Sequence, residues 1–68
     1  MSHRQTVQNH LAKIRKEKGV TQEALAEKVG VTRQTIFAIE KGNYTPSVAL
    51  ALRLSTFFKK PVEDIFYF

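Results

Sequence analysis

Residues 21–41 read TQEALAEKVGVTRQTIFAIEK, and this segment defines the architecture of the chain. Thr21 and Thr32 are residue types that cap helix N-termini, and each precedes a run with apolar residues at helical spacing. Gly30, between the two runs, can take the positive φ that ends a helix. The segment therefore predicts helices over residues 22–28 and 33–40, the second ending at residue 40 or 41, joined in a helix-turn-helix layout.

Three further helices are predicted around this unit. One is expected over residues 7–18, where apolar residues repeat at helical spacing and Gly19 follows as a stop. Another opens at residues 45–47, with a proline at or near its first position, and runs to about residue 58. A last short helix begins at Pro61 and reaches residue 66, with acidic residues in its first turn.

These elements predict an all-α fold, a compact bundle of five helices. No segment except residues 66–68 has the pattern of a strand. A single domain is expected over residues 1–68, with an N-terminal arm at about residues 1–5 and a short apolar tail at residues 67–68. Because pairs of short helices with a glycine between them also occur in proteins that bind no DNA, the spacing alone leaves the function open.

The composition narrows the class of function. The chain has 68 residues, with 11 Lys or Arg against 6 Asp or Glu, a net charge of +5 and a sequence pI of about 9.9. A chain of this length makes one small core and is too short for the walls of a deep catalytic pocket. No nucleophile–base pair, paired carboxylates or glycine-rich phosphate loop stands out, so no enzyme is predicted. The basic charge favours a polyanion, with nucleic acid ahead of anionic lipid.

The absence of cysteine excludes disulfides and thiolate metal sites and favours a cytoplasmic location. No carboxylate shares a helical face with both His3 and His10, so no metal or other cofactor is predicted. No apolar run approaches the roughly 20 residues that cross a bilayer, and residues 1–5 lack the apolar stretch of a signal peptide. Neither a membrane nor a small-molecule ligand is expected as a partner.

Residues 19–36, GVTQEALAEKVGVTRQTI, resemble the phage-repressor/Cro-type (Xre-type) helix-turn-helix family. The segments IEKG at 39–42, PS at 46–47 and EDIF at 63–66 extend the match in order and spacing. The resemblance covers about residues 7–66. It implies a five-helix bundle of the lambda-repressor-like type that binds operator DNA, usually as a dimer, and regulates transcription.

The second helix of such a unit lies in the major groove and presents its N-terminal residues to base edges. Arg33 matches the hydrogen-bonding edge of guanine, and Gln34 matches that of adenine. Phe37 and Ala38 depart from the polar residues usual in the family. Ala38 therefore offers no side-chain hydrogen bond to a base. Phe37 either packs on thymine methyls or sugars, folds back over the core or contacts a partner. By helical geometry four residues point away from Ile36 and Ile39 and form the predicted base-contacting set: Arg33, Gln34, Phe37 and Ala38.

Contacts to phosphate are predicted on either side of that helix. Gln22 begins a helix whose free N–H groups attract phosphate, and the resemblance implies that it also supports the recognition helix. Thr32 is first of all a cap. The predicted phosphate-contacting residues are Gln22, Thr32, Thr35, Lys41, Asn43 and Tyr44, and Arg4 and Lys13 add charge. For each, an ordinary solvated side chain is the alternative.

The resemblance assigns Arg15 and Glu40 a structural role rather than base reading. It implies a partly buried ion pair that ties the first helix to the end of the recognition helix. Removing one partner of a buried pair leaves an uncompensated charge. Glu40→Ala is therefore expected to destabilise the fold.

The fourth helix is apolar nearly all round, which calls for two buried faces. The face with Val48, Ala51, Leu52 and Phe58 is expected to meet the core. The other apolar residues and the tail suggest a two-fold homodimer, with the last residues pairing as a strand, unless the tail folds over its own core. The predicted dimer interface is Leu50, Leu54, Phe57, Ile65, Phe66, Tyr67 and Phe68.

Together these features predict a sequence-specific regulator of transcription that binds double-stranded DNA. It is expected to act as a homodimeric repressor on a near-palindromic operator. The alternative is a helical protein-interaction module, such as an antitoxin-like partner, with the apolar tail as its binding surface. A basic domain on anionic membranes is disfavoured because the charges do not segregate onto one long helix.

Overall fold

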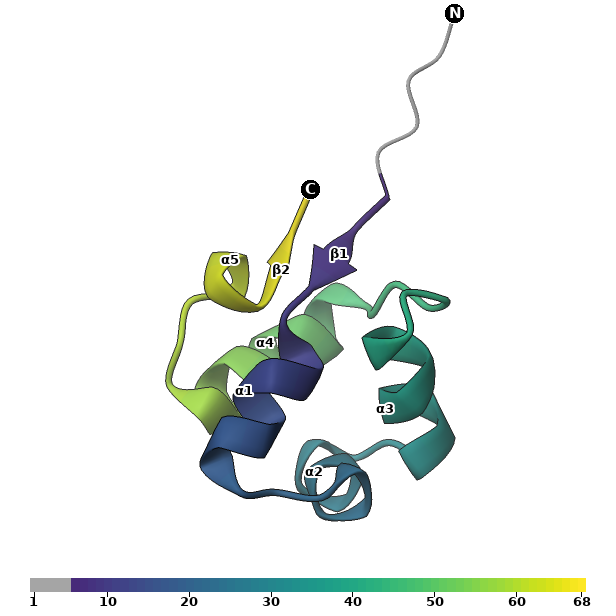
Figure 1. The fold of residues 1–68 in the computed structure, drawn as a ribbon, viewed down its shortest axis with the longest axis vertical. Helices are drawn as coiled ribbons and strands as arrows, with labels where there is room; N and C mark the ends of the chain where they lie inside the picture. Colours follow the sequence, from purple (N-terminus) through teal and green to yellow (C-terminus); the bar gives the residue numbers. More distant parts are fainter. Residues whose placement is uncertain (1–5) are drawn as a thin grey trace, which may run out of the picture.

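The computed structural model describes residues 6–68. It contains five helices and two short strands, in the order β1 (Gln8–Asn9), α1 (Leu11–Lys18), α2 (Gln22–Val29), α3 (Arg33–Glu40), α4 (Val48–Phe58), α5 (Val62–Ile65) and β2 (Phe66–Tyr67). Helix α1 crosses in front of α4, α2 closes one end of the bundle, α3 runs along one side, and the strands lie at the end opposite α2 (Figure 1). The predicted arm at residues 1–5, with His3 and Arg4, lies outside the described residues.

The segment from residue 21 to residue 41 forms the predicted helix-turn-helix. The Thr21 side chain accepts a hydrogen bond from the Ala24 amide at 3.0 Å, and Thr32 accepts one from the Thr35 amide at 3.2 Å. Between the helices Gly30 adopts φ +78°, a left-handed conformation that glycine takes without a steric penalty. The caps and the glycine thus set where α2 ends and α3 begins, which orients α3 against the bundle.

The prediction of a helix from residue 7 was wrong, because α1 begins at Leu11. Asn9 accounts for the difference: its side-chain oxygen accepts from the Leu11 amide at 3.0 Å, and its Nδ2 donates to the Ile39 carbonyl at 2.8 Å. Gln8 and Asn9 instead form β1, which pairs antiparallel with β2. The N-terminal segment is thereby tied to the end of α3 and to the C-terminal tail.

The tail pairs within its own chain rather than with a second subunit. Gln8 lies opposite Tyr67 and Asn9 opposite Phe66, and the His10 amide donates to the Ile65 carbonyl at 2.8 Å. The last helix is also shorter than predicted, since Pro61 is its N-terminal cap and Phe66 already belongs to β2. The expectation that the last residues pair as a strand across a dimer is therefore corrected to a strand pair inside the protomer.

The core draws on all five helices, and it corrects part of the face expected for α4, of which Phe58 is buried and Ala51 half-buried as predicted. Val48 and Leu52, predicted to meet the core, are 77% and 56% exposed, whereas Leu50 and Leu54 are buried. A helix that is apolar on every side carries no periodic signal to say which face is covered. The buried apolar residues are Leu11, Ile14, Leu25, Ala26, Val29, Ile36, Ile39, Leu50, Leu54, Phe58 and Ile65.

This packing corrects part of the predicted dimer interface. Leu50, Leu54 and Ile65 lie in the core of a single chain, so they offer no surface to a second copy. Phe57 stacks edge-on against Phe58, and only Phe66, Tyr67 and Phe68 of the predicted set lie together at the tail. No helix within residues 6–68 has the length and apolar character needed to span a membrane.

Candidate nucleic-acid interface

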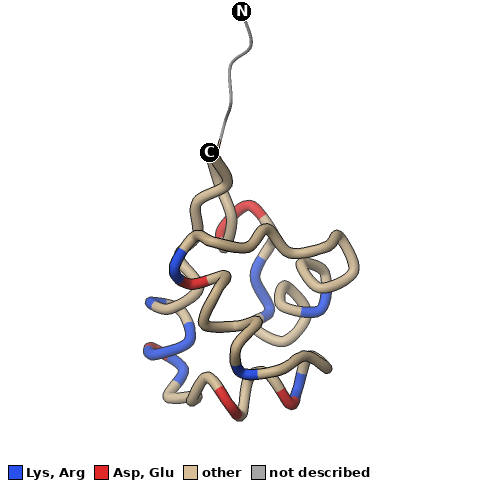
Figure 2. Tube along the Cα trace, turned by 90° about the vertical axis from the view of Figure 1, so that its right-hand side faces the viewer, with Lys and Arg blue, Asp and Glu red and all other residues tan. Residues whose placement is uncertain are grey.

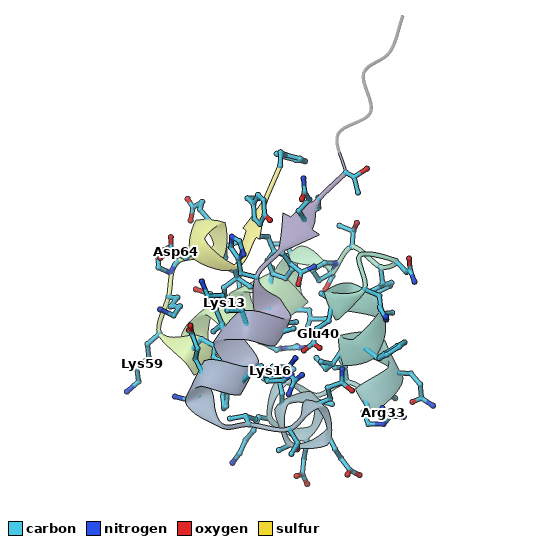
Figure 3. The ribbon with its side chains drawn as sticks, viewed as in Figure 1. Lys13, Lys16, Arg33, Glu40, Lys59 and Asp64 are labelled. Atoms are coloured by element: carbon cyan, nitrogen blue, oxygen red, sulfur yellow. The ribbon has the colours of Figure 1, made fainter. Side chains whose placement is uncertain are left out.

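The outward face of α3 is formed by the residues that the helical geometry predicted. Arg33, Gln34 and Phe37 are exposed, Ala38 is half-buried, and Ile36 and Ile39 are buried against the bundle. Arg33 points away from the bundle at one end of α3, while Glu40 points inward at the other end (Figure 3). The first turn of α3 therefore presents a guanidinium and an amide to solvent, the two groups that match the major-groove edges of guanine and adenine.

Phe37 does not fold back into the core. Its side chain is 46% exposed, and the Lys41 ammonium lies 5.5 Å from the centre of its ring. An ammonium at this distance over an aromatic face is attracted by the ring quadrupole. Phe37 and Lys41 thus form one apolar and cationic feature on the outward side of α3, next to the loop that follows the helix.

The predicted ion pair between Arg15 and Glu40 is present and nearly buried. Arg15 Nε donates to Glu40 Oε2 at 2.6 Å and Nη2 donates to Oε1 at 3.2 Å, with side chains 11% and 8% exposed. Arg15 Nη1 also donates to the Val20 carbonyl at 2.9 Å. This two-pronged geometry joins α1 to the last residue of α3 and to the segment before α2, so it holds the helix-turn-helix against the bundle.

Gln22 connects that buried pair to the outward face of α3. Its Nε2 donates to Glu40 Oε1 at 2.9 Å, which leaves its side-chain oxygen directed toward Arg33, whose Nη1 donates to it at 3.4 Å. One hydrogen of the amide group remains free for another acceptor. Gln22 is thus tied to α3 at both ends of that helix, and it also keeps a donor at the start of α2.

The other predicted phosphate-contacting residues flank α3. Thr32 and Thr35 lie at its N-terminal end with their hydroxyl oxygens 3.1 Å apart, Thr32 exposed and Thr35 half-buried. Lys41, Asn43 and Tyr44 are exposed in the loop at the opposite end. The structure thus brings the predicted residues to the two ends of one helix rather than into a single cluster.

The described residues form no candidate metal site. Within residues 6–68 there is no group of three or more side chains able to hold a metal ion. His10 instead stacks on Tyr67, with ring centres 4.4 Å apart, where β1 meets β2. His10 thus packs as an aromatic side chain and supports the strand pair.

Comparison with known proteins identifies the architecture. The model of a helix-turn-helix family matches residues 11–65, most of the chain and all five helices. The chain belongs to this helix-turn-helix family. An HTH-type transcriptional regulator of Methanothermobacter thermautotrophicus is 60% identical over 53 residues, which cover 76% of this chain and 77% of that protein. The regulator YgzD of Bacillus subtilis is 48% identical over 61 residues, covering 90% and 92%.

A solved structure agrees with these relatives. The crystal structure of the restriction-modification controller protein C.AhdI from Aeromonas hydrophila superimposes with a TM-score of 0.73 at 30% identity, covering 79% of this chain and 82% of that one. The chain is accordingly a transcriptional regulator with a helix-turn-helix DNA-binding domain, and it is not an enzyme. These relationships confirm the predicted family and fold class.

The charges of this helix-turn-helix protein surround α3 rather than forming one stripe on it. Viewed toward the α3 side, the Lys and Arg positions are scattered over the fold, and acidic positions lie both at the end that α2 closes and near the C-terminus (Figure 2). Glu23 and Glu27 line a depression together with Arg33 and Gln34. Sequence reasoning gave these two acids no part in the site, although their spacing of four residues already places both on one face of α2.

Asn9 is the other residue that sequence reasoning missed. It ties the end of α3 to β1 through its bond to the Ile39 carbonyl, and this contact spans 30 positions of sequence. The apolar spacing of residues 7–18 did not indicate this contact, because a single asparagine before a helix is common and does not reveal a distant partner.

Proposed function

We propose that the chain is a sequence-specific regulator that binds double-stranded DNA with α3 in the major groove. The observation that carries the proposal is the exposed first turn of α3, where Arg33 and Gln34 project from a helix that is braced by Gln22, Glu40 and Arg15. Helix α3, held by these side chains, keeps its orientation when it enters the major groove. Arg33 and Gln34 then discriminate bases, and Phe37 and Ala38 provide apolar contact, such as with thymine methyls.

Contacts to the DNA backbone complete the proposed interface. Gln22, Thr32 and Thr35 meet phosphates at the start of α3, and Lys41, Asn43 and Tyr44 meet them at its end. Their separation along one helix supports contacts on both sides of the groove. Such contacts position the protein without reading sequence, and they make its affinity depend on salt.

The proposed active form is a two-fold homodimer joined through the tail. Phe68 is 69% exposed, and it lines a mainly apolar depression of about 410 Å³ together with Val7, Val62, Glu63, Phe66 and Tyr67. Exposed apolar surface of this kind is typical of contact with another protein surface. A two-fold dimer places its recognition helices about 34 Å apart, one turn of DNA, and so favours a near-palindromic operator.

Repression is the proposed outcome of binding. A small domain that occupies a site within a promoter blocks other proteins from that site by occupancy alone. The likeness to a controller protein supports a regulatory role. The proposed activity also requires a cytoplasmic location, in line with the lack of cysteine, and residues 1–68 are proposed to act as one domain.

Selection of bound duplexes from a random pool, followed by footprinting of the selected duplex, tests the proposal. The expected result is a near-palindrome with two protected half-sites about one helical turn apart. Enrichment of no sequence above the starting pool would contradict sequence-specific binding. Failure to retain any duplex at low salt would instead favour the protein-interaction module.

A further inference from the structure

A second surface of the molecule lies on α4 and shares no residue with the depression at the tail. Val48 and Leu52 are one helical turn apart and are the two most exposed large apolar side chains of the helices, at 77% and 56%. Beside Leu52, the end of α2 and the second half of α4 form an open groove of about 380 Å³. We call it the α2–α4 groove, and it is lined by Lys28, Val29, Leu52, Arg53, Thr56 and Phe57.

The lining of the α2–α4 groove is partly apolar and partly cationic. Its apolar residues are Val29, Leu52 and Phe57, and its two cations, called the rim cations below, are Lys28 and Arg53. The Lys18 ammonium adds a third positive charge, 5.4 Å from the centre of the Phe57 ring. No Asp or Glu lines this groove.

The rim cations have no carboxylate partner among residues 6–68. Among residues 6–68 the ion pair within 4.0 Å is that of Arg15 with Glu40. Neither of these residues lines the groove. Cations beside apolar side chains attract a ligand that combines carboxylates with apolar side chains. A phosphate ion would make no apolar contact with Leu52 and Phe57. A purely apolar segment would leave the rim cations without an anionic partner.

We propose that the α2–α4 groove docks an acidic amphipathic helix of another protein. Apolar side chains of the partner, spaced three or four residues apart, would contact Leu52 and Phe57, while its carboxylates meet Lys28 and Arg53. The volume suits two or three side chains and is small for a folded domain. Arg33 and Gln34 line a different depression, so the partner and DNA occupy separate surfaces.

The test uses the full chain and two fluorescein-labelled helical peptides. Both peptides carry Leu and Phe at positions i, i+3, i+4 and i+7, one with Glu and the other with Lys at the remaining positions. We expect the acidic peptide to bind at micromolar concentration by fluorescence anisotropy, with at least tenfold weaker binding in 0.5 M NaCl, and the basic peptide not to bind. Equal binding of both peptides, or binding of neither, would overturn the proposal.

Matched variants locate the contact. Arg53→Glu and Leu52→Glu should each weaken binding of the acidic peptide at least tenfold. Lys13→Glu makes the same charge change as Arg53→Glu at an exposed position of α1, and it should change binding less than twofold. Circular dichroism of each variant shows whether it is folded, and both groove residues are exposed enough to be replaced. A peptide affinity that follows Lys13 as closely as Arg53 would show general charge attraction and refute the assignment.

The same variants and peptides test whether a second copy of this chain or a DNA duplex occupies the groove instead. If Leu52→Glu lowers the sedimentation mass of the free protein, the groove belongs to a contact between copies of this chain and the proposal fails. If saturating duplex displaces the acidic peptide, the surfaces are not separate, and that part of the proposal is wrong. Since the peptide assay contains no DNA, its failure is distinct from a failure of duplex binding.

Discussion

Gln22 and Glu40 are joined by a 2.9 Å hydrogen bond that connects the first residue of α2 to the last residue of α3. The same carboxylate accepts two bonds from Arg15, so both of its oxygens are occupied. A carboxylate held by three donors at once is fixed in position. This one acidic side chain therefore adds a polar link between the two helices, beside the Gly30 turn and the core residues that pack α2 against α3.

Glu40→Ala should destabilise the fold by about 3–5 kcal/mol, because it leaves the Arg15 guanidinium buried without its partner. Urea unfolding followed by circular dichroism measures the loss. Glu17→Ala, an exposed residue of α1, is the control and should change stability by less than about 0.5 kcal/mol. Equal midpoints for the Glu40 variant and the wild type would show that the pair contributes nothing.

Gln22→Ala should affect recognition more than stability. Glu40 keeps both bonds to Arg15 in this variant, so the expected loss of stability is about 1 kcal/mol. Arg33 loses the acceptor that orients it, and discrimination at the base that it reads should weaken. Competition binding with duplexes changed at that base measures the effect.

A double-mutant cycle separates positioning from an independent role of Gln22. If Gln22 acts through Arg33, adding Gln22→Ala to Arg33→Ala should cost no further discrimination at that base. Additive losses would mean that Gln22 makes its own contact and does not position Arg33. Loss of affinity for all duplexes alike, in both backgrounds, would assign Gln22 to phosphate alone.

Arg33→Ala and Lys41→Ala should have different consequences for DNA binding. The first should remove about 1–3 kcal/mol of preference for the selected operator over a duplex with the changed base. The second should weaken binding to every duplex and lower the slope of log K against log salt by about 0.9. Titrations at several salt concentrations test both, and an unchanged base preference in Arg33→Ala would remove that residue from the reading set.

The limits of sequence reasoning are clearest in α4 and β1. Thr21, Gly30 and Thr32 predicted the helix-turn-helix correctly because caps and a left-handed glycine act locally. The buried face of α4 could not be predicted from the sequence. The residues Val48, Leu50, Leu52 and Leu54 are all apolar, so their spacing does not indicate which side of the helix meets the core. The strand β1 is only two residues long and depends on pairing with residues almost sixty positions away, which no local pattern records.

The site shows the same division. The exposed positions of Arg33, Gln34 and Phe37 followed from helical geometry, and the ion pair of Arg15 with Glu40 followed from the family resemblance. The dimer residues Leu50, Leu54 and Ile65 were wrong because they depended on the undetermined face of α4 and on a tail whose strand pairing was not foreseen.

Lys59→Gly should stabilise the protein. Lys59 ends α4 with φ +54°, and among residues 6–68 it is the non-glycine residue that has a positive φ. This left-handed conformation costs an L-residue roughly 1–2 kcal/mol. After the extra chain entropy of glycine, a gain of up to about 1 kcal/mol is expected. Thermal unfolding compares it with Lys60→Gly, which removes the same charge one residue later and should not stabilise.

Phe68→Glu should convert the proposed dimer into a monomer, because it replaces the most exposed apolar side chain of the depression at the tail with a second carboxylate beside Glu63. Sedimentation at micromolar concentration measures the mass. Val48→Glu is the matched control, since Val48 is also apolar and exposed but belongs to α4 and does not line the depression at the tail. A one-chain mass for the wild type would exclude the dimer, and loss of the dimer in the Val48 variant would place the interface on α4.

Methylation protection of the selected operator tests most directly whether α3 reads the major groove. Dimethyl sulfate modifies guanine N7 in the major groove and adenine N3 in the minor groove, so it reports which groove is covered. We expect wild-type protein to protect guanine N7 symmetrically in both half-sites, and Arg33→Ala to lose protection at one guanine in each. Protection confined to adenine N3, or a guanine pattern that Arg33→Ala leaves unchanged, would contradict the insertion of α3 into the major groove.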